Sequence, residues 1–325
     1  MEDDEMAKKV YTSITQLVGN TPLVELTNYE KKLNLKAKIF AKLEYFNPES
    51  SVKDRIALNM LETAEKKGLI TPGKTTIVET TSGNTGIAVA AFAAAKGYKF
   101  VVYIQDEVSI ERKQVIKAFG AKLINLSEVP EYVEVLDETG GDFVAGIKVL
   151  KEKVIPKIEN SFFIDQVSNP ANPEAHYNTT AREIWNDTEG DVDIFVACAG
   201  TGGTITGTGR FLKEKKPSVK VVGVQPPVND VIVTGVHNFT DVQKERVPQV
   251  LNKEYIDDVV TIVPDSAFEA ARLLARTDGI LVGISSGAAL SVATDLAKSD
   301  ENEGKNIVVI LPDTGLRYLS TNLFA

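Results

Sequence analysis

A glycine-rich stretch in the second half of the chain has the composition of an anion-binding turn. Residues 200–204 read Gly-Thr-Gly-Gly-Thr and directly follow the apolar run 192–199. Such a turn between a strand and a helix directs backbone N–H groups, and here two threonine hydroxyls, toward one point in front of the helix. The dinucleotide fingerprint is incomplete because Ile205 stands at its third glycine, and no Gly-Lys-Ser/Thr follows as in a nucleotide P-loop. We expect a smaller phosphate ester to bind here, such as a phosphorylated cofactor; a tight connection without a ligand is the alternative. The residues concerned are Gly200, Thr201, Gly202, Gly203 and Thr204.

A lysine stands where a helix should begin in the first half of the chain. Lys53 follows Ser50 and Ser51 at the start of the helical pattern 52–67. A cation is electrostatically disfavoured at a helix N-terminus. That position favours the neutral amine, which is the nucleophilic form. The alternative is an exposed lysine in a charged Lys-Asp-Arg helix start.

Two further polar loops precede expected helices. Residues 80–86 read Thr-Thr-Ser-Gly-Asn-Thr-Gly. A plain N-cap needs one Ser or Thr, so five polar side chains indicate a carboxylate-binding loop. Residues 283–289 carry two serines that either cap a helix or bond a ring heteroatom. An amine, a carboxylate site, a phosphate site and a hydroxyl are what a pyridoxal phosphate enzyme acting on an amino acid needs.

Apolar runs and helical periods alternate almost throughout the chain, which predicts an α/β fold of two doubly wound domains with mainly parallel sheets. In such sheets, ligands bind beyond the carboxyl ends of the strands, where these polar loops fall. The proline-containing break at 155–172 suggests a domain boundary, and 225–252 reads as a long loop. We expect strands at 37–43, 75–80, 99–104, 121–126, 161–164, 192–199, 219–224, 280–282 and 306–311. We expect helices at 52–67, 86–96, 110–119, 143–157, 204–213, 267–276 and 287–297.

Composition excludes several classes of function. The net charge of -9 argues against a nucleic-acid partner, and no apolar run reaches the roughly 20 residues that span a membrane. Cys198 is the single cysteine, so no internal disulfide forms, and we expect a buried structural thiol. His176 and His237 are the only histidines and lack zinc-site spacing, so we expect no metal. The acidic N-terminus is unlike a signal peptide, and we expect a cytoplasmic protein.

The ordered motifs resemble the cysteine synthase (O-acetylserine sulfhydrylase) and cystathionine β-synthase family, pyridoxal phosphate enzymes of fold type II. The resemblance runs from Ser-Ile-Thr-Gln-Leu-Val-Gly-Asn-Thr-Pro-Leu at 13–23 to Arg-Tyr-Leu-Ser-Thr at 317–321, with Asn-Pro-Ala-Asn-Pro at 169–173 between them. It implies a tryptophan-synthase-β-like fold. Residues 1–44 and 161–325 would form the larger, cofactor-binding domain, and residues 45–160 a smaller, mobile, substrate-binding domain.

The resemblance also implies roles for individual residues. Lys53 matches the lysine that forms the internal aldimine with pyridoxal 5'-phosphate and then acts as acid and base at Cα. Asn84 matches the residue that bonds the ring hydroxyl of the cofactor, and Ser285 the hydroxyl that faces the pyridine nitrogen. Residues 200–204 match the phosphate loop. The substrate carboxylate loop corresponds to Thr81, Ser82 and Thr85, with Gln166 across from it.

One loop departs from the family pattern. Relatives carry glycines after the histidine that His237 matches, whereas this chain has Asn-Phe-Thr-Asp-Val-Gln-Lys-Glu-Arg at 238–246. Asp241 stands where the first glycine is expected. Asp241 or Glu245 would then act as a base that activates water or a thiol, or else the loop has lost its catalytic shape.

The leading prediction is β-replacement through α-aminoacrylate, which converts O-acetylserine and sulfide to cysteine. The first alternative is a β-replacement that consumes cysteine and releases hydrogen sulfide, with water or a thiol as the nucleophile. The second is a weakly active or non-catalytic binding or sensor protein. We expect a homodimer with a small amino-acid substrate. The altered loop argues against docking of a serine acetyltransferase tail.

Overall fold

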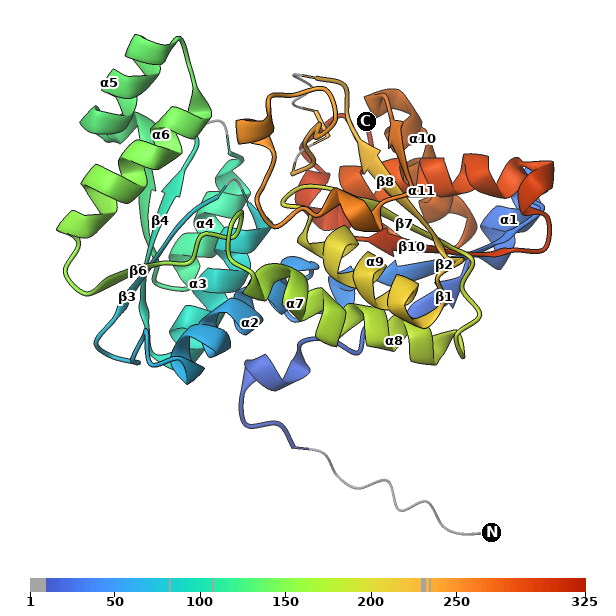
Figure 1. The fold of residues 1–325 in the computed structure, drawn as a ribbon, viewed down its shortest axis with the longest axis horizontal. Helices are drawn as coiled ribbons and strands as arrows, with labels where there is room; N and C mark the ends of the chain where they lie inside the picture. Colours follow the sequence, from blue (N-terminus) through green and yellow to red (C-terminus); the bar gives the residue numbers. More distant parts are fainter. Residues whose placement is uncertain (1–9, 82, 107, 229–231, 234) are drawn as a thin grey trace.

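The computed structural model describes residues 10–325 except 82, 107, 229–231 and 234. The chain folds into two α/β lobes, each built on its own sheet (Figure 1). The larger sheet has the order β1-β2-β10-β7-β8-β9, and all its neighbours are parallel except β1 and β2. The strands are β1 (Leu23–Glu25), β2 (Lys38–Leu43), β7 (Ile194–Cys198), β8 (Lys220–Gln225), β9 (Asp258–Thr261) and β10 (Asn306–Leu311).

The smaller sheet is parallel throughout and has the order β5-β4-β3-β6. Its strands are β3 (Thr76–Thr80), β4 (Lys99–Ile104), β5 (Lys122–Asn125) and β6 (Ser161–Phe163). The central strands of both sheets are Val- and Ile-rich and buried, as expected where helices cover both faces. The predicted α/β fold with two mainly parallel sheets is therefore confirmed.

Helices cover both sheets (Figure 1). The smaller lobe has α2 (Lys53–Lys66), α3 (Asn84–Lys96), α4 (Ile110–Ala118), α5 (Pro130–Thr139) and α6 (Phe143–Val149). The larger lobe has α1 (Thr27–Leu33), α7 (Ala171–Asn178), α8 (Thr180–Asp187), α9 (Gly203–Lys215), α10 (Pro264–Thr277) and α11 (Ile284–Lys298). Among the described residues, no helix is both long enough and apolar enough to cross a bilayer.

The structure differs from the sequence-based expectations at three places. Residues 161–163, expected in the larger domain, form β6 and pair with β3 of the smaller sheet. The helix expected at 143–157 is α6 followed by a π-helical turn at Leu150–Val154 and a 3-10 turn at Ile155–Lys157, where Pro156 cannot donate to an α-helical ladder. Residues 280–282 form no strand, and only Val282 makes an isolated bridge, to Thr314. The rest of the domain division stays a prediction.

Candidate active site

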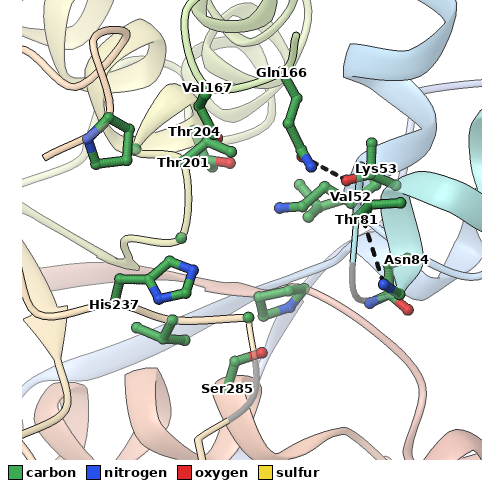
Figure 2. Close-up of a pocket in the computed structure, with 18 of the residues that line it drawn as sticks. Val52, Lys53, Thr81, Asn84, Gln166, Val167, Thr201, Thr204, His237 and Ser285 are labelled. Atoms are coloured by element: carbon green, nitrogen blue, oxygen red, sulfur yellow. Dashed lines mark hydrogen bonds between the residues drawn. The ribbon is translucent and has the colours of Figure 1, made fainter. Parts of the chain in front are cut away.

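A cavity of about 420 Å³ opens between the two lobes and collects most of the predicted site residues (Figure 2). Lys53, Thr81 and Asn84 lie on one wall, with Thr201 and Ser285 across from them. The predicted residues that line the cavity are Lys53, Thr81, Asn84, Thr85, Gln166, Gly200, Thr201, Gly202, Thr204 and Ser285. Ser82 lies outside the described residues.

Lys53 is the first residue of α2, and the end of β10 holds the chain that precedes it. Ser51 pairs with Asp313 in an antiparallel bridge, and the Val52 N–H donates to the Pro312 carbonyl over 2.8 Å. Burial lowers the pKa of Lys53, and the nearby Asp313 carboxylate only partly opposes this. A lowered pKa makes the neutral amine, the form that can act as a nucleophile or a base, more accessible.

The loop at 200–204 connects β7 to α9 and depends on its glycines. Gly202 has a φ of +84°, a backbone conformation that glycine adopts without strain. A Cβ on Gly200 would lie 2.2 Å from the Gly235 carbonyl oxygen, and a Cβ on Gly203 would lie 1.8 Å from Asn172 Oδ1. The same Asn172 donates through Nδ2 to Thr201 Oγ1 over 3.0 Å. The loop is thus a close-packed cradle at the N-terminus of a 13-residue helix, a suitable environment for a phosphate group.

A buried carboxyl group, that of Glu79, organises the loop at 80–86 and was not predicted from the sequence. Its two oxygens accept from the Thr80 N–H over 2.7 Å and from the Gln166 N–H over 3.1 Å. Gln166 in turn accepts from the Thr85 hydroxyl over 2.7 Å. Burial raises the pKa of Glu79 to about 8. Its place as a single acidic residue in an otherwise uncharged strand, Thr-Ile-Val-Glu-Thr, is the sequence signal that could have drawn attention to it.

Asn84 and Ser285 each occupy the first turn of a helix beside the cavity. Asn84 begins α3 and hydrogen-bonds through its side chain to Asp313 and Arg317. Ser285 lies in the first turn of α11, and its carbonyl accepts from the Cys198 thiol. Burial raises the pKa of Cys198 to about 12, so the thiol stays protonated at neutral pH and is a poor nucleophile.

Asp241 is not among the residues that line the cavity. Its side chain is exposed, and Oδ2 accepts from Asn238 over 3.1 Å and from Thr240 over 2.9 Å. These hydrogen bonds lower the pKa of Asp241 and leave it a weak base. Its predicted role as a catalytic base therefore has no support from geometry. The loop instead contributes His237 to the cavity wall, and Glu245 is exposed outside it.

Comparison with known proteins agrees with this arrangement. A family model described as pyridoxal-phosphate dependent enzyme matches residues 14–313. The chain belongs to this family. It is 41% identical to a cysteine synthase of Staphylococcus aureus strain Mu50 over 324 residues, which cover 98% of this chain and 99% of the relative.

Two crystal structures of relatives share the fold of this pyridoxal-phosphate dependent enzyme. O-acetylserine sulfhydrylase isoform 3 from Entamoeba histolytica superposes with a TM-score of 0.83 at 40% identity, covering 98% of this chain and 92% of the other. A hydrogen sulfide-producing enzyme from Fusobacterium nucleatum superposes with a TM-score of 0.82 at 38% identity, covering 96% and 99%. The predicted family and its cofactor dependence are thereby confirmed.

The cavity fits pyridoxal phosphate on its own structural terms. Its polar lining joins an amine of lowered pKa, Lys53, to a helix N-terminus whose loop would clash if Gly200 or Gly203 carried a Cβ. An aldehyde-bearing phosphate ester needs both features at once.

Proposed function

We propose that this chain is a cysteine synthase, which replaces the acetoxy group of O-acetylserine with sulfide to give cysteine. One observation carries the proposal: Lys53, whose pKa burial lowers, lines the same cavity as the glycine-rich loop at 200–204 and the polar loop at 80–86. The chain is also 41% identical to a cysteine synthase along nearly its full length. Pyridoxal phosphate, when bound, supplies an electron sink that allows a proton to leave Cα and a substituent to leave Cβ.

We assign recognition of the substrate carboxylate to the loop at 80–86. Thr81 and Thr85 offer hydroxyls, and Gln166 offers its amide across from them. The N-terminus of the 13-residue helix α3 adds a positive partial charge at the same place. This positions the substrate so that its Cα proton lies within reach of the amine of Lys53, which takes that proton.

We assign phosphate binding to residues 200–204 and the pyridine-nitrogen contact to Ser285. A serine hydroxyl, unlike a carboxylate, would not hold the pyridine nitrogen protonated. Such a partner would favour loss of a substituent from Cβ over build-up of charge at Cα. Both assignments agree with β-replacement.

We also propose a homodimer in the cytoplasm. The cysteine synthase and O-acetylserine sulfhydrylase relatives act on small amino-acid substrates. Cys198 as the single cysteine suits a reducing compartment. A serine acetyltransferase tail is a less favoured partner because the charged segment 241–246 replaces the family's glycines. Light scattering of the purified protein would measure the assembly, and titration with a peptide of such a tail would test docking.

The experiment that tests the function is the visible absorption of the purified, pyridoxal phosphate-loaded protein. The band of the bound cofactor should change when O-acetylserine is added and return when sulfide follows. Lys53→Ala, run beside it, should show no such cycle. A band that responds to cysteine with release of sulfide, and not to O-acetylserine, would instead favour the sulfide-producing reaction.

A further inference from the structure

The C-terminal segment of the larger lobe forms hydrogen bonds to both the nitrogen and the oxygen of the Asn84 side-chain amide. Its Nδ2 donates to Asp313 Oδ2 over 2.8 Å, and its Oδ1 accepts from Arg317 Nη1 over 2.5 Å. Asp313 is fully buried and also accepts from the Tyr318 hydroxyl over 2.7 Å. Arg317 is anchored in turn through Nη2 to the Glu49 carbonyl. The Asn84 amide is therefore one of the points at which the smaller lobe is hydrogen-bonded to the larger lobe.

This environment permits a single orientation of the Asn84 amide. A rotation by 180° would place the NH₂ group against the guanidinium of Arg317, which has only donors, and would place the carbonyl oxygen against Asp313 Oδ2. Both hydrogen bonds would be lost. The amide nitrogen has two hydrogens, and Asp313 takes one of them. One N–H therefore remains, while the guanidinium draws electron density from the carbonyl oxygen and makes it a poorer acceptor.

We propose that Arg317 and Asp313 are positioning residues that fix Asn84 as a hydrogen-bond donor toward the ring oxygen of pyridoxal phosphate and so select the oxyanion form of that oxygen. The inference rests on the proposed function, because it takes Asn84 as the partner of the ring oxygen. A donor stabilises an oxyanion more than it stabilises a hydroxyl, which would need an acceptor for its own proton. The assignment makes the C-terminal segment part of the cofactor site although Arg317 itself does not line the cavity.

The surrounding positive charges act in the same direction. Asn84 is the first residue of α3, so the helix N-terminus would lie beside a ring oxygen bound to Asn84. Lys53 projects from α2 and Arg112 from α4, and Arg112 stacks over the Tyr318 ring at 5.3 Å. The Asp313 carboxylate acts on Lys53 in the opposite direction, so its part in the proposal is to orient the Asn84 amide. The other titratable groups that line the cavity are Glu79, Asp165, His237 and Cys198.

Arg317→Met is the direct test, and its readout is the ionisation of the bound cofactor. We expect the pH at which the visible band converts to rise by about one unit, and the dissociation constant of pyridoxal phosphate for the apo protein to rise roughly tenfold at neutral pH. Arg317→Lys keeps a cationic donor near Asn84 Oδ1 and should restore most of both values. A purely structural role for Arg317 would lower the melting temperature of the apo protein without moving the band.

Arg272→Met is the matched control. Arg272 also ties the C-terminal segment down, through three backbone carbonyls of residues 322, 323 and 325, but does not contact Asn84. The visible band of the Arg272→Met protein should convert at the same pH as that of the unaltered protein. If the Arg317→Met protein does not fold, Asn84→Asp is the variant to measure. It removes the amide N–H altogether, so it should also raise the pH at which the visible band converts.

The outcomes separate the inference from the proposed function. Titration of the Arg317→Met or Asn84→Asp protein within about 0.3 units of the unaltered protein would overturn the inference. The proposed function would then stand, provided that the unaltered protein binds pyridoxal phosphate and responds to O-acetylserine. Failure of the unaltered protein to bind pyridoxal phosphate would instead overturn the proposed function.

Discussion

Arg55 lies two residues after Lys53 in α2 and anchors that helix to the larger lobe. Its guanidinium donates to Glu44 through Nε over 2.7 Å and through Nη2 over 2.8 Å. It also donates to Glu183 of α8 over 2.6 Å and 2.7 Å, and to the Thr21 hydroxyl over 3.0 Å. Glu44 is fully buried, and Arg55 is 2% exposed. The Arg55 side chain thus donates five hydrogen bonds and joins segments that are far apart in the sequence.

Replacing Arg55 with Met should lower the free energy of unfolding by about 3–5 kcal/mol, because the change leaves a buried carboxylate without its counter-charge. Thr21 and Asn47 would still donate to Glu44, so its hydrogen bonding would be partly kept. A domain has about 5–15 kcal/mol in total, so this loss is a large fraction of it. Adding Glu44→Gln to Arg55→Met should recover part of the loss by removing the unpaired charge.

Urea unfolding followed by the fluorescence of Trp185 measures this directly, because Trp185 is the only tryptophan and lies on α8 with Glu183. Arg210→Met is the matched control, since Arg210 pairs with Glu174 and Glu214 at the surface, and it should cost about 1 kcal/mol. If Arg55→Met costs no more than the control, the buried cluster does not stabilise α2 as argued.

Three further changes test separate parts of the site. Gly203→Ala should weaken binding of pyridoxal phosphate to the apo protein at least about tenfold, because its Cβ would lie 1.8 Å from Asn172 Oδ1. The control Gly304→Asn, at an open left-handed position, should bind pyridoxal phosphate normally. Equal binding by the two variants would contradict phosphate binding by the loop at 200–204. Burial raises the pKa of Glu79 to about 8, so the folded state keeps a proton that the unfolded state loses above its ordinary value of 4.5, and stability falls as pH rises through that window. Glu79→Gln should remove on the order of 4 kcal/mol of this dependence between pH 5 and 8 in urea unfolding, and an unaltered slope would show that Glu79 is ionised when folded. Asp241→Asn should leave turnover of O-acetylserine with sulfide within about twofold, whereas a slower sulfide step alone would return Asp241 to the role of base.

The polar and glycine-rich loops at 80–86 and 200–204 could be predicted from the sequence because each is one continuous stretch of the chain. Each is a run of small and polar residues between an apolar strand and a helix, and parallel strands bring such runs to one edge of the sheet. The fold class followed from the same alternation. The irregular end of α6 was not foreseen, although Pro156 marks where regular hydrogen bonding stops.

The long-range contacts could not be predicted. Glu79 meets Gln166 across 87 residues, and Asn84 meets Asp313 across 229, so no local pattern encodes either pair. Asp241 is the opposite case. Its position at the first glycine of the family pattern suggested a place in the site, but hydrogen bonds to Asn238 and Thr240 hold its carboxylate among its own neighbours.

The most direct test of the proposed reaction is to follow isotopically labelled sulfide into product. The purified protein, loaded with pyridoxal phosphate, is given O-acetylserine and labelled sulfide, and free cysteine is quantified by mass spectrometry. We predict one labelled cysteine for each O-acetylserine consumed, and none with Lys53→Ala. Consumption of O-acetylserine without labelled cysteine, or equal product from Lys53→Ala, would contradict the proposed reaction.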